Sequence, residues 1–213
     1  MSGDFFWFTE TPKAYFIAVV DCTGHGVPGA MMSMIGYNYL GQIVNEQDID
    51  SPVEILNELH RKVIFALNKD YTSRQMKDGM DVALLRIDKK TKQILFTGAV
   101  RPLYIVTNGN LTEVKGDIYS IGGIKDVNAQ TFTQHEITAP AGSCIYLFSD
   151  GYADQFGGSG GKKFKYKNLR ALLVKNSGLP MEKQREEAEK TFINWRAELE
   201  QVDDVCLMGL RVH

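Results

Sequence analysis

Short apolar stretches separated by turn residues dominate the sequence between residues 80 and 114. Four of them follow in succession, at residues 82–87, 94–97, 103–106 and 111–114. Turn-forming segments, such as residues 88–92 and Asn108-Gly109-Asn110, lie between them. Short apolar stretches bounded by such residues are typical of strands joined by tight connections. The pattern predicts an antiparallel meander in the middle of the chain.

The flanking regions predict further strands and three helices. Strands are expected at residues 15–20, 131–137, 144–148 and 205–212, and helices at residues 28–45 and 52–68. The second helix begins with Ser51-Pro52-Val53-Glu54, the sequence of a capping box with proline at the first helical position. A third helix is indicated by the spacing of Met181, Ala188, Phe192, Trp195 and Leu199. Runs of strands with grouped helices favour an α+β layered domain over a βαβ nucleotide-binding fold.

Composition limits the classes of partner. A chain of 213 residues with 44% hydrophobic residues has the size of one globular domain, residues 1–213. Its net charge of −2, with acids and bases mixed, provides no basic surface for nucleic acid and no polybasic segment for a membrane. No apolar run approaches the roughly 18 residues of a membrane span. The widely spaced Cys22, Cys144 and Cys206 predict neither disulfides nor a zinc site and fit a reducing cytoplasm.

Aspartates stand where three of the predicted strands meet turns. Asp21 follows the first predicted strand, Asp150 lies in Ser149-Asp150-Gly151, and Asp203-Asp204 precedes the last strand. Any one of them could be a turn residue selected for local hydrogen bonding. Together, carboxylates at strand ends can converge on one rim of a sheet and bind hard divalent cations such as Mg²⁺ or Mn²⁺. Two such ions can activate a water and polarise a phosphoryl oxygen.

These blocks resemble a known family. The order of Ser2-Gly3-Asp4-Phe5-Phe6, residues 21–30, Leu147-Phe148-Ser149-Asp150-Gly151 and Asp203-Asp204-Val205 is similar to that in PPM (type 2C-like) phosphatases of the sporulation stage II E branch. The resemblance covers nearly the whole chain. It implies a four-layer α-β-β-α sandwich, in which two antiparallel sheets are flanked by helices, and an activity that hydrolyses phosphoserine or phosphothreonine.

The resemblance also implies the metal ligands. Asp21 matches the aspartate that bridges two Mn²⁺ or Mg²⁺ ions, and Cys22 matches a residue whose backbone carbonyl holds one of them. Asp150 and Asp203 match the remaining carboxylate ligands. Asp4 matches an acidic residue that contacts a metal directly or through water. The expected reaction is direct attack of the activated water on phosphorus, with no phosphoenzyme and no nucleophilic cysteine.

Four further residues have roles that the sequence does not decide. Asp204 is expected to support the ligands. His25 could donate a proton to the leaving serine oxygen, or could be a loop residue that contacts phosphate. Asp154, one helical turn after Asp150, could orient a ligand water or be a solvated carboxylate. Arg101 could contact a phosphate or face water.

The resemblance further implies a regulatory setting. Domains of this branch are commonly the C-terminal output of longer signalling proteins, so the parent of this cytoplasmic domain could be membrane-attached. The helices within residues 28–68 would be the region through which a homodimer or partner switches activity. The substrate would be a phosphorylated regulatory protein, such as an anti-sigma-factor antagonist. Two alternatives are a catalytically silent module that binds a phosphoprotein and a phosphoesterase for small molecules.

Overall fold

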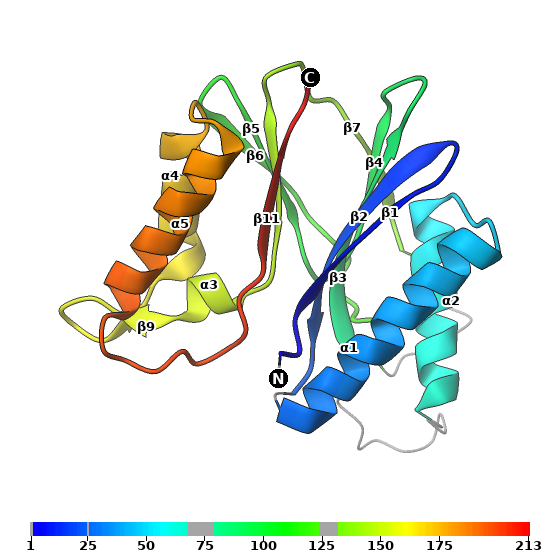
Figure 1. Cartoon of the computed structure of the whole chain (residues 1–213), viewed down its shortest axis with the longest axis horizontal. Helices are drawn as coiled ribbons and strands as arrows, with labels where there is room; N and C mark the ends of the chain where they lie inside the picture. Colours follow the sequence, from blue (N-terminus) through cyan, green and yellow to red (C-terminus); the bar gives the residue numbers. More distant parts are fainter. Residues whose placement is uncertain (1, 25, 68–78, 124–131) are drawn as a thin grey trace. The chain divides into compact units, whose positions relative to one another are not determined.

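The computed structural model describes residues 2–24, 26–67, 79–123 and 132–213, and separates into two compact units (Figure 1). Unit 1 comprises Met1–Pro102 and Lys115–Thr138, and unit 2 comprises Leu103–Val114 and Ala139–His213. Each unit contains an antiparallel sheet of its own with helices on one face. The predicted α+β class with two antiparallel sheets is therefore confirmed.

The sheet of unit 1 has the strand order β1-β2-β3-β4-β7, and every neighbouring pair is antiparallel. The strands are β1 (Phe5–Glu10), β2 (Ala14–Cys22), β3 (Met80–Asp88), β4 (Ile94–Ala99) and β7 (Gln134–Ile137). The sequence analysis did not predict β1, in which Trp7 is buried whereas Phe6 and Phe8 are exposed. The predicted strand at residues 131–137 begins later, at Gln134, and residue 131 lies outside the described residues.

Two helices cover one face of this sheet: α1 (Gly26–Gly41) and α2 (Pro52–Ala66) (Figure 1). A single π-helical turn, η1 (Gln42–Glu46), follows α1, so the helix predicted for residues 28–45 begins two residues earlier and changes type before its end. The apolar face of α2 is buried as predicted. Ser51 is the N-cap of α2 but makes no side-chain capping hydrogen bond, so the capping-box prediction is wrong.

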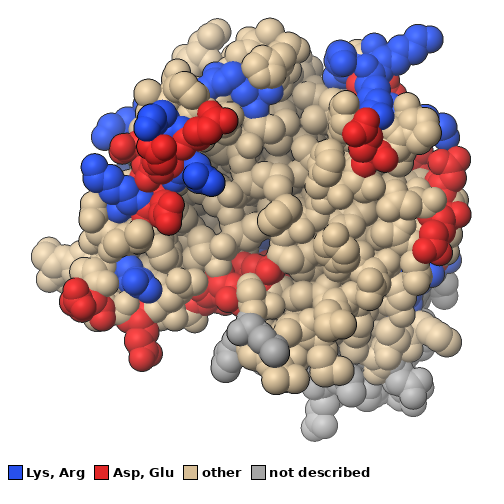
Figure 2. All heavy atoms as spheres, in the orientation of Figure 1, with Lys and Arg blue, Asp and Glu red and all other residues tan. Residues whose placement is uncertain are grey.

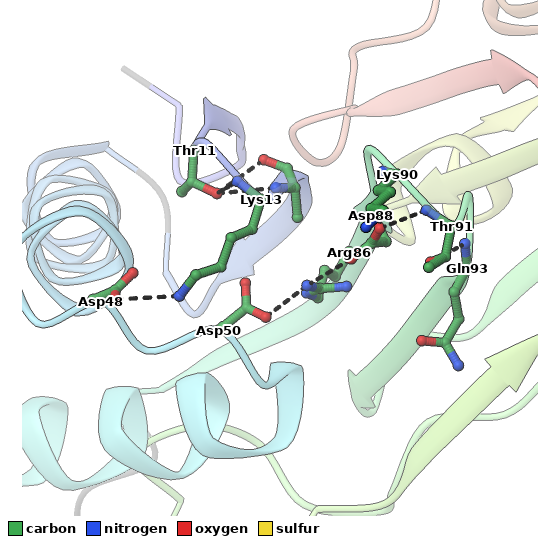
Figure 3. A network of polar contacts seen from close by, with 10 residues as sticks. Thr11, Lys13, Asp48, Asp50, Arg86, Asp88, Lys90, Thr91 and Gln93 are labelled. Carbon is green, nitrogen blue, oxygen red and sulfur yellow. Dashed lines mark hydrogen bonds and ion pairs between the residues drawn. The ribbon is translucent and has the colours of Figure 1, made fainter.

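A polar network ties β3 to the segment between η1 and α2 (Figure 3). The buried Arg86 guanidinium donates to Asp50 Oδ2 at 2.6 Å and lies 3.3 Å from Asp88 Oδ2. Asp88 Oδ1 in turn accepts the backbone N–H groups of Lys90 and Thr91 at 2.9 and 2.8 Å. One carboxylate therefore closes the β3–β4 turn and also helps to neutralise a buried guanidinium.

The sheet of unit 2 has the order β11-β8-β5-β6, again antiparallel. Its strands are β5 (Leu103–Thr107), β6 (Asn110–Val114), β8 (Cys144–Phe148) and β11 (Leu207–Arg211), and a small hairpin joins β9 (Phe156–Gly157) to β10 (Lys162–Lys163). The helices are α3 (Gly151–Asp154), α4 (Lys165–Asn176) and α5 (Met181–Arg196). The last is the third predicted helix, whereas α4 was not predicted and buries only Leu169, Leu173 and Asn176.

The two units present different surfaces (Figure 2). Lys and Arg side chains are interspersed with Asp and Glu over α4 and α5, whereas α1 contains no charged residue and the surface over it is uncharged in this view. Among the described residues, no helix is both long and apolar enough to cross a membrane. All three cysteines lie in the part of the chain that the structure describes, and no disulfide joins any two of them.

Candidate metal centre

In unit 1, Asp21 is the penultimate residue of β2, and the Gly3-Asp4 segment is fixed beside the start of α1. The Ser33 hydroxyl lies 2.6 Å from the Gly3 carbonyl oxygen and 2.9 Å from that of Gly29. Gly29 is needed for this approach, since a Cβ there would lie 2.3 Å from the Gly24 carbonyl oxygen and 3.3 Å from the Gly3 Cα. The first turns of α1 and the segment that carries Asp4 are therefore packed backbone to backbone.

The electrostatics of Cys22 show that carboxylates gather here. Burial is the main cause that raises the pKa of the Cys22 thiol to about 12, and the negative charges of Asp21, Asp4 and Asp81 raise it further. A hydrogen bond with Ser33 acts in the opposite direction. The thiol is therefore protonated at neutral pH, which agrees with the prediction that Cys22 is no nucleophile. Three carboxylates lie close enough to act on one side chain.

Arg101, whose role the sequence left open, lies beside the same carboxylates. Arg101 is only 8% exposed, and its guanidinium donates to Asp81 Oδ2 from Nη2 at 2.8 Å and from Nε at 3.3 Å. The same Nη2 lies 3.5 Å from Asp21 Oδ2. The alternative that Arg101 faces water is therefore wrong. Ser120 donates to the other Asp81 oxygen at 2.5 Å, so Asp81 is held from both sides.

In unit 2, Asp150 lies two residues after the end of β8 and is the N-cap residue of α3, but its side chain makes no capping hydrogen bond. The preceding residue, Ser149, holds the segment before β11 by two hydrogen bonds of 2.9 Å. The Ser149 N–H donates to the Cys206 carbonyl, and the Cys206 N–H donates to Ser149 Oγ. A Cβ at Gly151 would lie 2.0 Å from the Asp204 carbonyl oxygen. The Ser-Asp-Gly motif therefore allows the Asp203-Asp204 segment to approach Asp150.

Charge is concentrated in this group too. The pKa of Asp203 is raised, first by partial burial and then by the negative charges of Asp150, Asp204 and Asp154. The Asp204 backbone N–H, which donates to Asp203 Oδ1 at 2.9 Å, partly offsets this. Asp154 ends α3, and its partly exposed carboxylate pairs with Lys163 Nζ at 2.7 Å. A bound cation would relieve the repulsion among these aspartates.

Gln155 is a supporting residue that the sequence analysis missed. Its buried amide donates to the carbonyls of Phe156 and Glu200 at 3.0 and 2.8 Å, and its side-chain oxygen accepts the Val202 N–H at 3.3 Å. Gln155 thereby fixes the chain just before Asp203. Only its position immediately after α3 could have drawn attention to it.

The donor chemistry of both groups fits hard divalent cations, because carboxylate oxygens are the ligands that Mg²⁺ and Mn²⁺ prefer. The structure brings Asp4, Asp21 and Cys22 together within unit 1, and Asp150, Asp203, Asp204 and Asp154 within unit 2. Across the described ranges, no set of three or more His, Cys, Asp or Glu side chains is arranged to hold a metal ion. His25 lies outside the described residues.

Solved structures share this fold. The SiaA-PP2C domain of Pseudomonas aeruginosa is 29% identical and superposes with a TM-score of 0.87, covering 100% of this chain and 81% of that one. The PP2C phosphatase domain of SpoIIE from Bacillus subtilis gives a TM-score of 0.73 at 18% identity, covering 100% of this chain and 57% of that chain. The second likeness concerns the fold alone. Both likenesses show that this chain has the fold of PP2C-type phosphatase domains.

The family follows from the sequence comparison. Residues 11–213 match the model of the stage II sporulation protein E (SpoIIE) family, and the chain belongs to that family. It is also 30% identical, over 158 residues, to phosphoserine phosphatase RsbU of Bacillus subtilis strain 168. That match covers 72% of this chain but only 43% of RsbU, so the chain spans less than half of this curated relative.

Proposed function

We propose that this chain is a metal-dependent serine/threonine phosphatase that hydrolyses phosphoserine or phosphothreonine on a regulatory protein. The observation that carries the proposal is the presence of two dense groups of aspartates at strand ends in a chain of the SpoIIE family. The name of RsbU, a phosphoserine phosphatase, supports the substrate class. PP2C-type domains are metal-dependent, and we propose two ions, Mn²⁺ or Mg²⁺.

The residues proposed to hold the ions are Asp21, Asp150 and Asp203, with Asp4 and the Cys22 carbonyl in support. The ions would activate a water for attack on phosphorus and offset charge on the transferring phosphoryl group. The chain's own contribution is to fix the ligands: Ser33 and Gly29 hold the Asp4 segment, while Ser149 and Gly151 hold the segments of Asp150 and Asp203. No side chain is required as a covalent nucleophile.

The setting proposed for the chain is a cytoplasmic output domain of a longer signalling protein, acting on a phosphorylated anti-sigma-factor antagonist. The uncharged α1 begins four residues after Cys22, so movement of α1 would be transmitted to the ligands. We therefore keep the proposal that residues 28–68 carry a homodimer or partner contact. The exposed apolar side chains of Met31, Met34 and Tyr37 in α1 support it.

The test is phosphate release from a phosphoserine peptide and from a generic aryl phosphate, with Mn²⁺ and with EDTA. Turnover that requires Mn²⁺ and is lost in Asp150→Asn is the expected result, with the remote, exposed Asp48→Asn as control. Phosphopeptide binding without turnover would favour the silent binding module. Turnover of the aryl phosphate alone would favour a phosphoesterase for small molecules.

A further inference from the structure

Arg101 is held in place by a tightly built turn. It follows Val100, whose φ of 65° is strained for a β-branched residue. The turn is fixed by Val100 N–H donating to the Asp117 carbonyl and by Arg101 N–H donating to the Ala99 carbonyl, both at 2.7 Å. A Cβ at Gly98 or at Gly116 would lie 2.4 or 2.6 Å from the Arg101 carbonyl oxygen. The backbone around Arg101 therefore leaves its position little freedom.

Arg101 lies between two carboxylates that would otherwise repel each other. Asp21 and Asp81 are direct partners across β2 and β3, and like charges in this arrangement are destabilising. The guanidinium lies 2.8 Å from Asp81 and 3.5 Å from Asp21, and both carboxylates are largely buried. Since Ser120 and Arg101 engage both Asp81 oxygens, Asp81 serves as the anchor of the guanidinium. Asp21 is its second, looser partner.

We propose that Arg101 is a resident cation that positions the Asp21 carboxylate and competes with a divalent ion for it. The inference rests on the proposed role of Asp21 as a metal ligand. A fixed positive charge beside Asp21 offsets the carboxylate repulsion in the metal-free protein and repels an incoming divalent cation. Asp81 sets the strength of that competition, because it draws the guanidinium toward itself and away from Asp21.

The proposal predicts opposite signs for two substitutions. Arg101→Gln removes the competing charge, so Mn²⁺ should bind roughly tenfold more tightly or better. Asp81→Asn removes a negative charge and the anchor that draws Arg101 away from Asp21, so Mn²⁺ should bind more weakly. Arg101→Lys keeps the charge and should remain close to the native affinity. A residue needed only for folding would give no such pattern.

The experiment is isothermal titration of the purified chain with Mn²⁺, together with thermal unfolding in EDTA and in saturating Mn²⁺. Arg101→Gln should unfold at a lower temperature than the native chain in EDTA. Its unfolding temperature should rise more than that of the native chain when Mn²⁺ is added. Equal or weaker Mn²⁺ binding in Arg101→Gln would overturn the proposal. If that variant does not fold, equal or tighter binding in Asp81→Asn would overturn it instead.

Asp21→Asn separates this inference from the proposed function. If Asp21→Asn binds Mn²⁺ like the native chain, Asp21 is no ligand, and the proposed metal centre and the role of Arg101 both fail. If Asp21→Asn weakens binding while Arg101→Gln does not strengthen it, the role of Arg101 alone is wrong. Weaker binding in Asp21→Asn with tighter binding in Arg101→Gln supports both.

Discussion

Asp21 and Asp81 face each other directly across the antiparallel strands β2 and β3. Two carboxylates in register at the end of a strand pair are costly unless a cation compensates them. In this chain the compensation comes from the guanidinium of Arg101. The packing around these carboxylates and around Asp203 in unit 2 can be tested by substitution, as can the pH dependence of Asp88 and the role of Cys22.

Gly29→Ala should destabilise unit 1 by roughly 1–3 kcal/mol, because overpacking forces backbone shifts. The new Cβ would meet the Gly24 carbonyl oxygen at 2.3 Å, and backbone cannot yield as a flexible side chain can. Chemical denaturation measures the change. The control is Gly41→Ala in the same helix, where a Cβ meets nothing within 4 Å. Equal stability of the two variants would contradict the close packing.

Gly151→Ala should weaken metal binding by displacing the Asp203-Asp204 segment from Asp150. The added Cβ would lie 2.0 Å from the Asp204 carbonyl oxygen and 3.2 Å from a Val205 methyl group. Mn²⁺ titration of a folded variant tests this, with Gly178→Ala, which has open space around the new Cβ, as the matched control in unit 2. Native affinity in Gly151→Ala would show that this close approach does not matter for the ligands.

Asp88 should contribute a stability that depends on pH. Hydrogen bonds from Thr91 are the main cause that lowers the pKa of Asp88 from 3.8 to about 2, with Lys90 and Arg86 assisting. Because the folded-state pKa is depressed, the contribution is present above about pH 4 and is lost as the pH falls toward 2. Asp88→Asn should therefore lower the unfolding midpoint at pH 7 but not at pH 2.

The comparison variant for Asp88 is Asp48→Asn. Asp48 is exposed and pairs with the exposed Lys13 at 3.3 Å (Figure 3). Exposed ion pairs contribute little, so its substitution should hardly change the midpoint at either pH. An Asp88→Asn effect that persists unchanged at pH 2 would contradict the assignment.

Cys22→Ala should retain phosphatase turnover within about twofold. The proposed contribution of this residue is a backbone carbonyl, which the substitution preserves, and its buried thiol is protonated at neutral pH. Phosphate release under Mn²⁺ saturation is the measurement, with circular dichroism to confirm folding. Complete loss of turnover in a folded variant would indicate that the sulfur takes part in the chemistry.

The sequence was most informative where local pattern and motif coincide. Asp21 and Asp150 could be placed at strand ends because apolar strands precede them, and the buried face of α2 followed from its helical spacing. Pairings over long sequence distances were out of reach. The contact of Arg101 with Asp81 depends on how β3, β4 and the following turn are folded, and no local signal specifies it.

The absence of a local signal also explains why the role of Gln155 and the π-helical turn η1 were not predicted. Gln155 acts through the Glu200 carbonyl and the Val202 N–H, both more than forty residues away. The π-helical turn changes the end of a helix whose apolar spacing continues without interruption. Strand β1 was missed because its aromatic side chains are divided between buried and exposed positions at a sheet edge.

The central claim is that aspartates of this chain bind two divalent ions that activate a water. It is tested most directly by counting the Mn²⁺ bound per chain by calorimetric titration of the native protein and of Asp21→Asn. The account predicts two ions for the native chain and a clear loss of binding in Asp21→Asn. Unchanged stoichiometry and affinity in Asp21→Asn would contradict it.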